Sequence, residues 1–570
     1  MNNRLIIIVI LLQVLSVKSI AQEPVKDDLL KIMVGRFGQA TVSMPFPGAG
    51  EMDVISRNAS VISLRDNKLK IVLSPLTVGW FISRKYDYRI IETDDNKGII
   101  TAGTTKEAME WDSYPTYVQY DSIMQSFVAL YPQICHLDTI GATNYGKIVL
   151  ALKISDNPLT DEDEPEAFYS SSIHGNETGG FILMLRLADY LLKHYNTESR
   201  TRNLVDNLEI WINPLANPDG AYKTGNTISS PTRFNANGYD LNRNFPDPVS
   251  DNPNKQMETL DMMTFMKSHN FVLSANFHAG KEVVNYPWDR WERRHPDDDW
   301  FYYISRKYAD TAHIHSAAGY MTFLDNGVTN GWDWYSVYGG RQDYVTWELH
   351  GREVTIELDD NYITPVSQLG SLWESNYRSL IGFLGNALYG IRGTVTDNIT
   401  GEAVPAKVFV EGHDADNSHV LCDTLTGGFT RLIATGAWHL RFTADGYLTR
   451  VVDVIVADEQ MTWADVKMDP IVNPIDTVTT AGLFIYPNPA NEFIKVVLPE
   501  RQIGIVEVMI FNSVGINIRL NSVNSIVHTT EDIPLYINVQ DLPGGVYTII
   551  IRNRATKVTD KASFVIVHRK

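Results

Sequence analysis

The sequence predicts a multidomain α/β protein, with a sheet covered by helices on both faces at its centre. Three observations support this fold class. The chain has 570 residues, which is too long for one hydrophobic core. Between residues 111 and 389, apolar segments alternate with helical patterns, which favours a sheet between helical layers. After Gly390 the helical patterns stop, and the strands that follow predict two small β-sandwiches.

The central segment is expected to begin with a helix and to continue as strands alternating with helices. Pro115-Thr116 precedes apolar residues spaced for one helix face, and Pro132 ends that helix. These apolar residues are Tyr120, Ile123, Met124, Phe127 and Tyr131. A further helix is expected at Gly179–His194, and strands at Ile148–Ile154, Phe168–Ile173, Leu208–Asn213, Phe271–Phe277 and Val354–Leu358. In open α/β sheets, ligands bind beyond the strand ends, which is where we expect a site.

The segments before the centre predict export and a small extra domain. Residues 1–21 have the pattern of a signal peptide, with Arg4, an apolar run and a small-residue cleavage site at Ser19-Ile20-Ala21. The apolar run is shorter than the roughly 20 residues of a spanning helix, and no later segment is expected to cross a membrane. Residues 22–110 predict a β-rich or α/β domain, which is an inhibitory propeptide, a folding aid or a permanent domain.

The segments after the centre predict two β domains joined by a linker. The first covers 390–470 and the second 481–570, and the Pro- and Asp-containing stretch 471–480 separates them. Strands of the first are expected at Ile391–Thr396, Lys407–Glu411, Thr430–Ile433, Trp438–Thr443 and Val451–Val456.

Composition narrows the possible partners. The formal net charge of -19 argues against nucleic acid, which needs a basic face, and suits cationic peptides. The only cysteines, Cys135 and Cys422, are far apart and lie in no catalytic motif. We expect both to be free, buried thiols.

Three residues form the clearest candidate metal site. His174 and Glu177 stand where a predicted strand gives way to a helix, and His278 ends another strand. The H-x-x-E spacing alone is weak, because it recurs at His350 and His528. Two histidines with one glutamate leave the fourth position of zinc open for water, as catalysis requires. The sequence therefore predicts one bound Zn²⁺.

Other polar residues are candidates for acid–base chemistry and carboxylate binding. Glu357 lies in an apolar strand, where a carboxylate serves either as a general base or as one half of a buried ion pair. Arg233 and Arg243 flank a polar, Gly-containing stretch. The guanidinium fork suits a developing oxyanion and a free C-terminal carboxylate, with surface salt bridges as the alternative.

The segment from Trp111 to Tyr389 resembles the zinc metallocarboxypeptidases, most closely the carboxypeptidase N/E subfamily. The motifs that carry the resemblance occur in the order typical of the family. They are His174-Gly-Asn-Glu177, Asn217-Pro-Asp-Gly220, Gly238-Tyr-Asp-Leu-Asn-Arg-Asn-Phe-Pro246, Asn276-Phe-His278, Asn285-Tyr-Pro-Trp-Asp289, Gly339-Gly-Arg-Gln-Asp-Tyr344 and Thr355-Ile-Glu-Leu358.

The resemblance implies a mixed sheet, a peptidase activity and a role for each site residue. Zinc would be held by His174, Glu177 and His278, with Glu357 as general base and Arg233 on the oxyanion. The substrate's terminal carboxylate would be bound by Asn242, Arg243 and Tyr344. Asp289 would select Lys or Arg, although a structural cap is the alternative for this residue.

The two β domains carry resemblances of their own. Residues 390–470 look like the transthyretin-like domain that follows the catalytic domain in this subfamily, on Ile391-Arg-Gly-Thr-Val-Thr-Asp397 and Ala444-Asp-Gly-Tyr447. Residues 481–570 are similar to a C-terminal sorting domain of type IX secretion, on Ile485-Tyr-Pro-Asn-Pro-Ala-Asn491 and Leu542-Pro-Gly-Gly-Val-Tyr547. This implies contact with the type IX machinery and a secreted or cell-surface protein of a Gram-negative, Bacteroidota-like bacterium.

The expected function is release of C-terminal Lys or Arg from peptides or proteins by a monomeric zinc enzyme. One alternative keeps the chemistry but acts on apolar C-termini or cell-wall peptides. Another is a surface protein that binds peptide tails without cleaving them.

Overall fold

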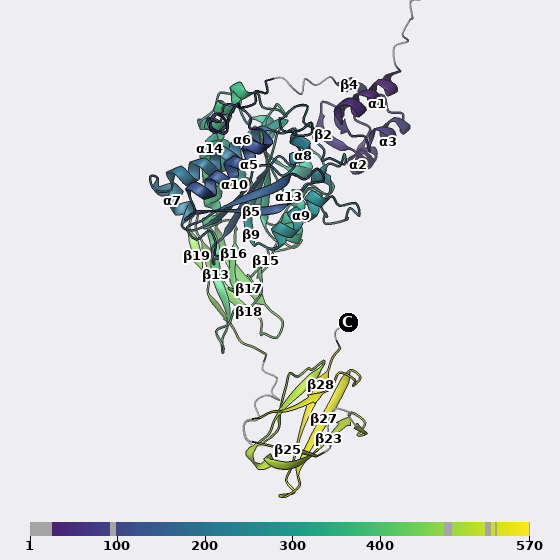
Figure 1. The fold of residues 1–570 in the computed structure, drawn as a ribbon, viewed down its shortest axis with the longest axis vertical. Helices are drawn as coiled ribbons and strands as arrows, with labels where there is room; N and C mark the ends of the chain where they lie inside the picture. Colours follow the sequence, from purple (N-terminus) through teal and green to yellow (C-terminus); the bar gives the residue numbers. More distant parts are fainter. Residues whose placement is uncertain (1–24, 92–97, 472–481, 519–525, 531–532, 569–570) are drawn as a thin grey trace, which may run out of the picture. The chain divides into compact units, whose positions relative to one another are not determined.

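The computed structural model describes residues 25–91, 98–471, 482–518, 526–530 and 533–568, and Figure 1 shows their fold. They form two compact units, the first ending at Asp469 and the second beginning at Pro470. The predicted signal peptide and most of the predicted linker lie outside the described residues. In the described part of the chain, every helix is too short or too polar to cross a membrane.

The first unit is organised around a mixed sheet with strand order β11-β10-β12-β9-β7-β8-β6-β5. Strands β12, β9, β7 and β8 are parallel to one another. The pairs β10 with β12, β6 with β8 and β5 with β6 are antiparallel. The mixed sheet is thus confirmed. The bounds are β5 Cys135–Ala142, β6 Ile148–Ile154, β7 Glu166–Ser171, β8 Glu209–Asn213, β9 Phe271–His278, β10 Lys281–Tyr286, β11 Val328–Asn330 and β12 Arg352–Asp359.

Helices cover both faces of this sheet. Successive side chains of a strand point to opposite faces, so each face carries apolar side chains that must be buried. On β7, Tyr169 lies in one apolar core and Phe168 in another. The core around Tyr169 is closed by α5 (Tyr117–Leu130), α6 (Gly179–His194), α7 (Ser199–Val205), α10 (Asp298–Ile314) and α14 (Val366–Gly385). The core around Phe168 is closed by α9 (Met257–Lys267) and α13 (Arg341–Glu348).

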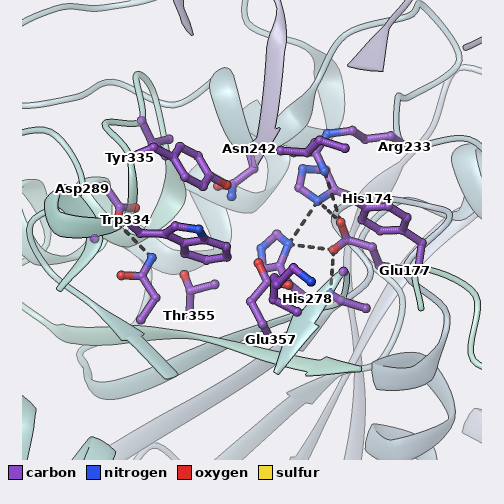
Figure 2. A pocket seen from close by; sticks show the side chains of 18 of the residues that line it. His174, Glu177, Arg233, Asn242, His278, Asp289, Trp334, Tyr335, Thr355 and Glu357 are labelled. Carbon is purple, nitrogen blue, oxygen red and sulfur yellow. Dashed lines mark hydrogen bonds and ion pairs between the residues drawn. The ribbon is translucent and has the colours of Figure 1, made fainter. Parts of the chain in front are cut away.

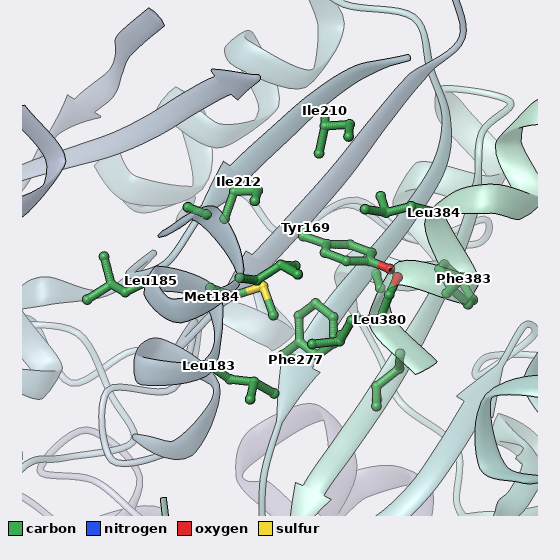
Figure 3. Close-up of a cluster of buried hydrophobic side chains, with 14 of the residues drawn as sticks. Tyr169, Leu183, Met184, Leu185, Ile210, Ile212, Phe277, Leu380, Phe383 and Leu384 are labelled. Carbon is green, nitrogen blue, oxygen red and sulfur yellow. Dashed lines mark hydrogen bonds between the residues drawn. The ribbon is translucent and has the colours of Figure 1, made fainter. Parts of the chain in front are cut away.

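Tyr169 shows how a polar aromatic residue is accommodated in the larger core. Its ring meets Phe277 of β9 edge-on, with 5.0 Å between centroids. Its hydroxyl donates to the carbonyl oxygen of Leu380 on α14 at 2.8 Å, so the buried oxygen is satisfied (Figure 3). This contact joins the sheet to a covering helix two residues before the end of β7.

The predicted helix and strand positions are largely confirmed. Helix α6 and strand β6 have the predicted bounds. Helix α5 begins at a capping box, in which Thr116 and Gln119 bond to each other's backbone N–H groups. Short helical segments complete the unit: α4 Thr105–Ala108, α8 Pro218–Ala221, η1 Leu241–Arg243, α11 Phe323–Gly327, α12 Gly331–Trp334 and η2 Asn386–Leu388.

The N-terminal residues form an α/β layer with its own core. The antiparallel sheet has the order β2-β3-β1-β4, from β1 Ala40–Pro45, β2 Ser60–Arg65, β3 Lys68–Leu73 and β4 Arg89–Ile91. Helices α1 (Lys26–Phe37), α2 (Ala49–Asn58) and α3 (Val78–Ser83) share its apolar cluster. Ala102 and Ala108, within the predicted range 22–110, pack instead into the central core.

The β domains follow the predicted order. In the first unit, sheets β16-β13-β19, with β20 beside β13, and β15-β14-β17-β18 enclose a shared core. Their strands are β13 Gly390–Asp397, β14 Lys407–Val410, β15 Val420–Leu421, β16 Gly428–Arg431, β17 Gly436–Thr443, β18 Arg450–Val456, β19 Met461–Trp463 and β20 Val466–Met468. Cys422 lies in this core and Cys135 in the central one, and both are free, buried thiols as predicted.

The second unit is built from strands in two groups around one apolar cluster. The orders are β21-β22-β26 and β24-β23-β27-β28, with β25 also on β23. The bounds are β21 Phe484–Tyr486, β22 Phe493–Val497, η3 Glu500–Gln502, β23 Gly504–Asn512, β24 Asn517–Ile518, β25 Ile526–Thr529, β26 Leu535–Asn538, β27 Gly545–Asn553 and β28 Thr559–Ile566.

Candidate active site

The three predicted metal ligands converge at the carboxyl ends of neighbouring strands. His174 and Glu177 lie in the turn from β7 to α6, and His278 ends β9. Nδ1 of His174 is 2.8 Å from Oε1 of Glu177, and Nδ1 of His278 is 2.8 Å from Oε2. The two Nδ1 atoms are 3.1 Å apart (Figure 2). All three side chains are buried, so these donors face one another without water competing for them.

The protonation of this group suits a metal ion. Burial lowers the pKa of His278 to about 4, which leaves its imidazole neutral with a lone pair to donate. Burial opposes ionisation of Glu177, but the two histidines outweigh it and hold the pKa of this carboxyl below its usual range. Two histidine imidazoles and a glutamate carboxylate are the ligand types that zinc binds with a fourth position open. The residues present therefore fit the ion.

Asp240 contacts the candidate ligand His174 on the side away from the other two ligands' Nδ1 and carboxylate contacts, and the sequence did not predict this role. Its Oδ1 is 3.0 Å from Nε2 of His174, so a proton on Nε2 leaves Nδ1 free for a metal. Its Oδ2 accepts from Nε of Arg233 at 2.9 Å. Asp240 lies inside the motif Gly238–Pro246, but the spacing in one sequence does not indicate that its carboxylate reaches His174.

Arg233 is held rigidly beside the ligands, as an oxyanion-binding group requires. Besides its bond to Asp240, its Nη1 donates to Oε1 of Glu177 at 3.2 Å. The guanidinium is buried, and although burial opposes its charge, Asp240 and Glu177 raise the pKa of Arg233 above its usual value. Arg233 is therefore a fixed positive charge in the wall of the pocket.

Glu357 lies on β12 next to β9, in the strand register that pairs it with His278. Its Oε2 is buried and has no hydrogen-bond partner among the described residues. Burial, followed by the charge of Glu177, raises the pKa of Glu357 well above its usual range. A carboxyl group with a raised pKa and an unpaired buried oxygen, next to three candidate metal ligands, is a candidate functional group.

One pocket joins the metal ligands to most of the predicted substrate residues. Figure 2 shows the ligands grouped at one side, and Asp289, Trp334 and Tyr335 at the other. Of the predicted residues, those lining the pocket are His174, Glu177, Arg233, Asn242, Arg243, His278, Asp289 and Glu357. Trp334, Tyr335, Thr355 and Tyr362 also line it and were not predicted as site residues, because no spacing in the sequence links them to the metal ligands.

Asp289 is a buried carboxylate at the far side of the pocket. Its Oδ1 accepts from Nδ2 of Asn285 and from Nε2 of Gln342, each at 3.0 Å. Burial raises the pKa of Asp289 to about 6. Neighbouring Asp343 accepts the backbone N–H groups of Asp289 and Arg290, which fixes the turn that carries the pocket carboxylate.

Tyr344 lies elsewhere than expected. It is 1% exposed and packs in the core beneath α13, with its ring 5.3 Å from that of Phe245. It does not line the pocket, because α13 turns this position towards the sheet. Tyr335, which precedes the Gly339-Gly340 turn, lines the pocket instead.

The N-terminal α/β layer reaches the same pocket. Ile62 of β2 is one of the lining residues. The carbonyl oxygen of Val61 accepts from Nη2 of Arg243 at 3.1 Å. Oγ of Ser60 donates to Oδ2 of Asp240 at 2.6 Å. The start of β2 therefore contacts both the predicted carboxylate-binding arginine and the support of the metal ligands.

Comparison with known proteins identifies the family of the central segment. Residues 120–379 match the family model described as zinc carboxypeptidase. The chain is 32% identical to the carboxypeptidase N catalytic chain of Rattus norvegicus over 409 residues, covering 64% of this chain and 88% of that protein. The chain therefore belongs to the zinc carboxypeptidase family, whose members are metal-dependent hydrolases.

Other matches cover different shares of the chain. Human carboxypeptidase D is 36% identical over 353 residues, and the match covers 59% of this chain but 25% of that longer protein. The solved carboxypeptidase A of Helicoverpa armigera has 16% identity and a TM-score of 0.47, over 61% of this chain and 97% of the other. Residues 484–566 match the model of a secretion system C-terminal sorting domain.

Proposed function

We propose that the protein is a zinc carboxypeptidase that releases single C-terminal residues, with a preference for Lys and Arg. The observation that carries this proposal is that one pocket contains both the ligand group His174, Glu177 and His278 and the buried carboxylate of Asp289. A centre that cleaves and a carboxylate that pairs a cationic side chain would then act on the same substrate.

The terminal carboxylate of the substrate would be held by Arg243 and Asn242. Both line the pocket that also contains the metal ligands and Asp289. Arg243 offers a planar fork that matches a carboxylate, and the backbone carbonyl oxygen of Asn242 accepts from its Nη1 at 2.7 Å. Tyr335, on the same pocket wall, replaces Tyr344 as the tyrosine proposed to contact the bound substrate.

The proton would be handled by Glu357, and the developing negative charge by Arg233. When bound, one zinc ion at the three ligands polarises the scissile carbonyl and acidifies a water molecule. Glu357 accepts the proton of that water and passes it to the departing amine. Arg233, fixed by Glu177 and Asp240, stabilises the oxyanion without having to reorganise.

Zinc removal tests the reaction class. Protein dialysed against a chelator is expected to lose release of Arg from a blocked dipeptide and to regain it when Zn²⁺ is added. Circular dichroism of the same samples checks that the fold persists. Full activity of metal-free protein would contradict the proposal, and activity with Leu but not with Arg would favour the apolar-substrate alternative.

We propose that the N-terminal layer is an inhibitory domain. The support is the hydrogen bond from Arg243 to the carbonyl oxygen of Val61, which uses a donor that a substrate carboxylate needs. Ile62 also fills part of the pocket wall.

Export is proposed from the C-terminal segment. The match of residues 484–566 to a sorting domain supports transport by a type IX system, to the cell surface or the medium. Deleting residues 482–570 is expected to retain the protein inside the cell, which fractionation and immunoblotting would measure. Unchanged export of the shortened chain would contradict this.

A further inference from the structure

An acidic cluster lies at the edge of the central sheet opposite the active site. The loop between β6 and β7 is rich in carboxylates, and two more begin the strands that follow. The members of the cluster are Asp156, Asp161, Glu162, Glu164, Glu166 and Glu209. Glu166 and Glu209 are the first residues of β7 and β8 and are register partners. His174 follows the opposite end of β7. From the rise per residue of a strand, Glu166 and His174 are about 20 Å apart.

The carboxylates are close enough to share cations. Asp161, Glu166 and Glu209 each present an oxygen within 4.8 Å of the others, and Asp156, Glu162 and Glu164 do the same. The backbone N–H of Glu162 donates to Oε1 of Glu209 at 2.9 Å, which links the two groups. The loop is therefore folded so that its negative charges converge.

Glu166 makes this cluster more than a solvated acidic surface. Glu166 is only 6% exposed, and its Oε2 has no hydrogen-bond partner among the described residues. Oε2 of Glu164 and Oδ1 of Asp156 are likewise buried without a described partner. Buried carboxylate oxygens are costly unless a donor or a cation satisfies them, so this arrangement points to a missing positive charge.

The protein supplies only part of that charge. Nζ of Lys153 lies 2.8 Å from Oε2 of Glu209 and donates to the carbonyl oxygen of Thr160 at 2.6 Å. One ammonium group faces the three carboxyl groups of Asp161, Glu166 and Glu209. When all three are ionised, two negative charges remain, which a single divalent cation would neutralise.

We propose that Asp161, Glu166 and Glu209 bind a calcium ion. The neighbouring carboxylates of Asp156, Glu162 and Glu164 add negative charge near the ion. Every side-chain ligand in this set is a carboxylate oxygen, the hard donor that Ca²⁺ prefers. Calcium also accepts irregular coordination by a flexible loop, whereas Mg²⁺ demands a near-ideal octahedron. The proposed site shares no residue with the zinc pocket and is independent of the proposed activity.

The expected effect is on stability, because the loop abuts the β-sandwich of the first unit. Oδ1 of Asp163 lies so close to Gly428 of β16 that a Cβ there would come within 1.7 Å of it. Burial raises the pKa of Asp163 and the charge of Arg392 on β13 partly offsets this rise, which puts that guanidinium near the loop as well. A bound cation would hold the loop in this position against the sandwich.

Calcium titration of the full-length, zinc-loaded chain tests the proposal. After removal of other divalent cations, calorimetry with CaCl₂ is expected to detect binding in the range of about 0.1–1 mM, typical of extracellular sites. The first thermal transition should rise by about 2–6 °C in about 5 mM Ca²⁺, and less in Mg²⁺. Glu110→Gln, at an exposed acid outside the cluster, should respond like the parent.

Glu166→Gln separates calcium binding from a purely structural role. Without calcium this variant should be at least as stable as the parent, because a buried charge is removed, but calcium should no longer raise its melting temperature. Asp161→Asn, at an exposed ligand, should bind calcium about tenfold more weakly or worse, and it guards against misfolding of the first variant. Absence of calcium binding by the parent, or an unchanged calcium response in both variants, would overturn the proposal.

Discussion

Glu357 and His278 are register partners on the adjacent parallel strands β12 and β9. Their side chains therefore enter the same pocket from backbone positions fixed by the sheet. A sheet is a rigid support, and this pairing sets the distance between a proposed base and a proposed metal ligand without help from a loop.

Glu357→Gln should separate catalysis from metal binding. The amide cannot accept the proton, so kcat is expected to fall by about 10²–10⁴-fold or more. Zinc content, measured by atomic absorption, should remain at the parent level because Glu357 is not a ligand. Asp360→Asn, at an exposed position three residues further along, is the matched control and should keep its activity. Loss of zinc from Glu357→Gln would show that its role is structural.

Asp289 should make the preference for basic substrates dependent on pH. Its pKa of about 6 means that the carboxylate is increasingly protonated, and uncharged, as the pH falls below that value. The ratio of kcat/KM for C-terminal Arg to that for C-terminal Leu should fall by about tenfold between pH 7 and pH 5. A ratio that does not change with pH would argue that another group pairs the substrate cation.

Asp297 should be essential to the joint between the central sheet and the β-sandwich of the first unit. Its Oδ2 accepts from Nε of Arg352 on β12 and from Nη1 of Arg431 on β16, each at 2.9 Å. Both arginines are buried, and Arg431 also pairs with Asp414 at 2.6 Å. Asp297→Asn would therefore remove the ion-pair partner of Arg352 and leave Arg431 with Asp414 alone, and it is expected to cost about 3–5 kcal/mol. Urea unfolding measures this.

A matched control exists near the same joint. Asp416 pairs with Arg293 in a partly exposed ion pair, with distances of 2.8 and 2.9 Å. Asp416→Asn should change stability far less, because water screens that pair. Equal losses in the two variants would contradict the importance assigned to burial.

Separation of the N-terminal layer should increase activity. A site-specific protease sequence inserted between Ile91 and Gly98 allows the cut to be made after folding. Cutting is expected to lower KM, because Arg243 no longer donates to Val61 and the wall formed by Ile62 is removed. An insertion of the same length, with a sequence that the protease cannot cleave, controls for the effect of the added residues. Unchanged kinetics after complete release would favour a permanent domain.

Much of this architecture follows from local sequence patterns. Helix α6 was predicted at Gly179–His194 and strand β6 at Ile148–Ile154 because long apolar patterns indicate both type and bounds. His174 and Glu177 are near in sequence, so only His278 required a long-range assumption. The family motifs then supplied the order of the remaining residues.

What the sequence did not predict depends on orientation in space. Tyr344 and Tyr335 both lie near the Gly339-Gly340 turn, and only the direction of α13 shows that Tyr344 points into the core. Asp240 reaches His174 through a fold that brings the motif back over the strand ends. The docking of Ile62 into the pocket joins elements far apart in the chain, for which no local pattern exists.

The central claim is tested most directly by comparing C-terminal Arg, Lys, Leu and Phe substrates with one zinc-loaded preparation and its Asp289→Asn variant. The account predicts that the parent prefers Arg and Lys, and that the variant loses about 100-fold or more on these while changing little on Leu and Phe, because an amide cannot pair a buried cation. Equal losses on all four substrates, or a parent that prefers Leu and Phe, would contradict it.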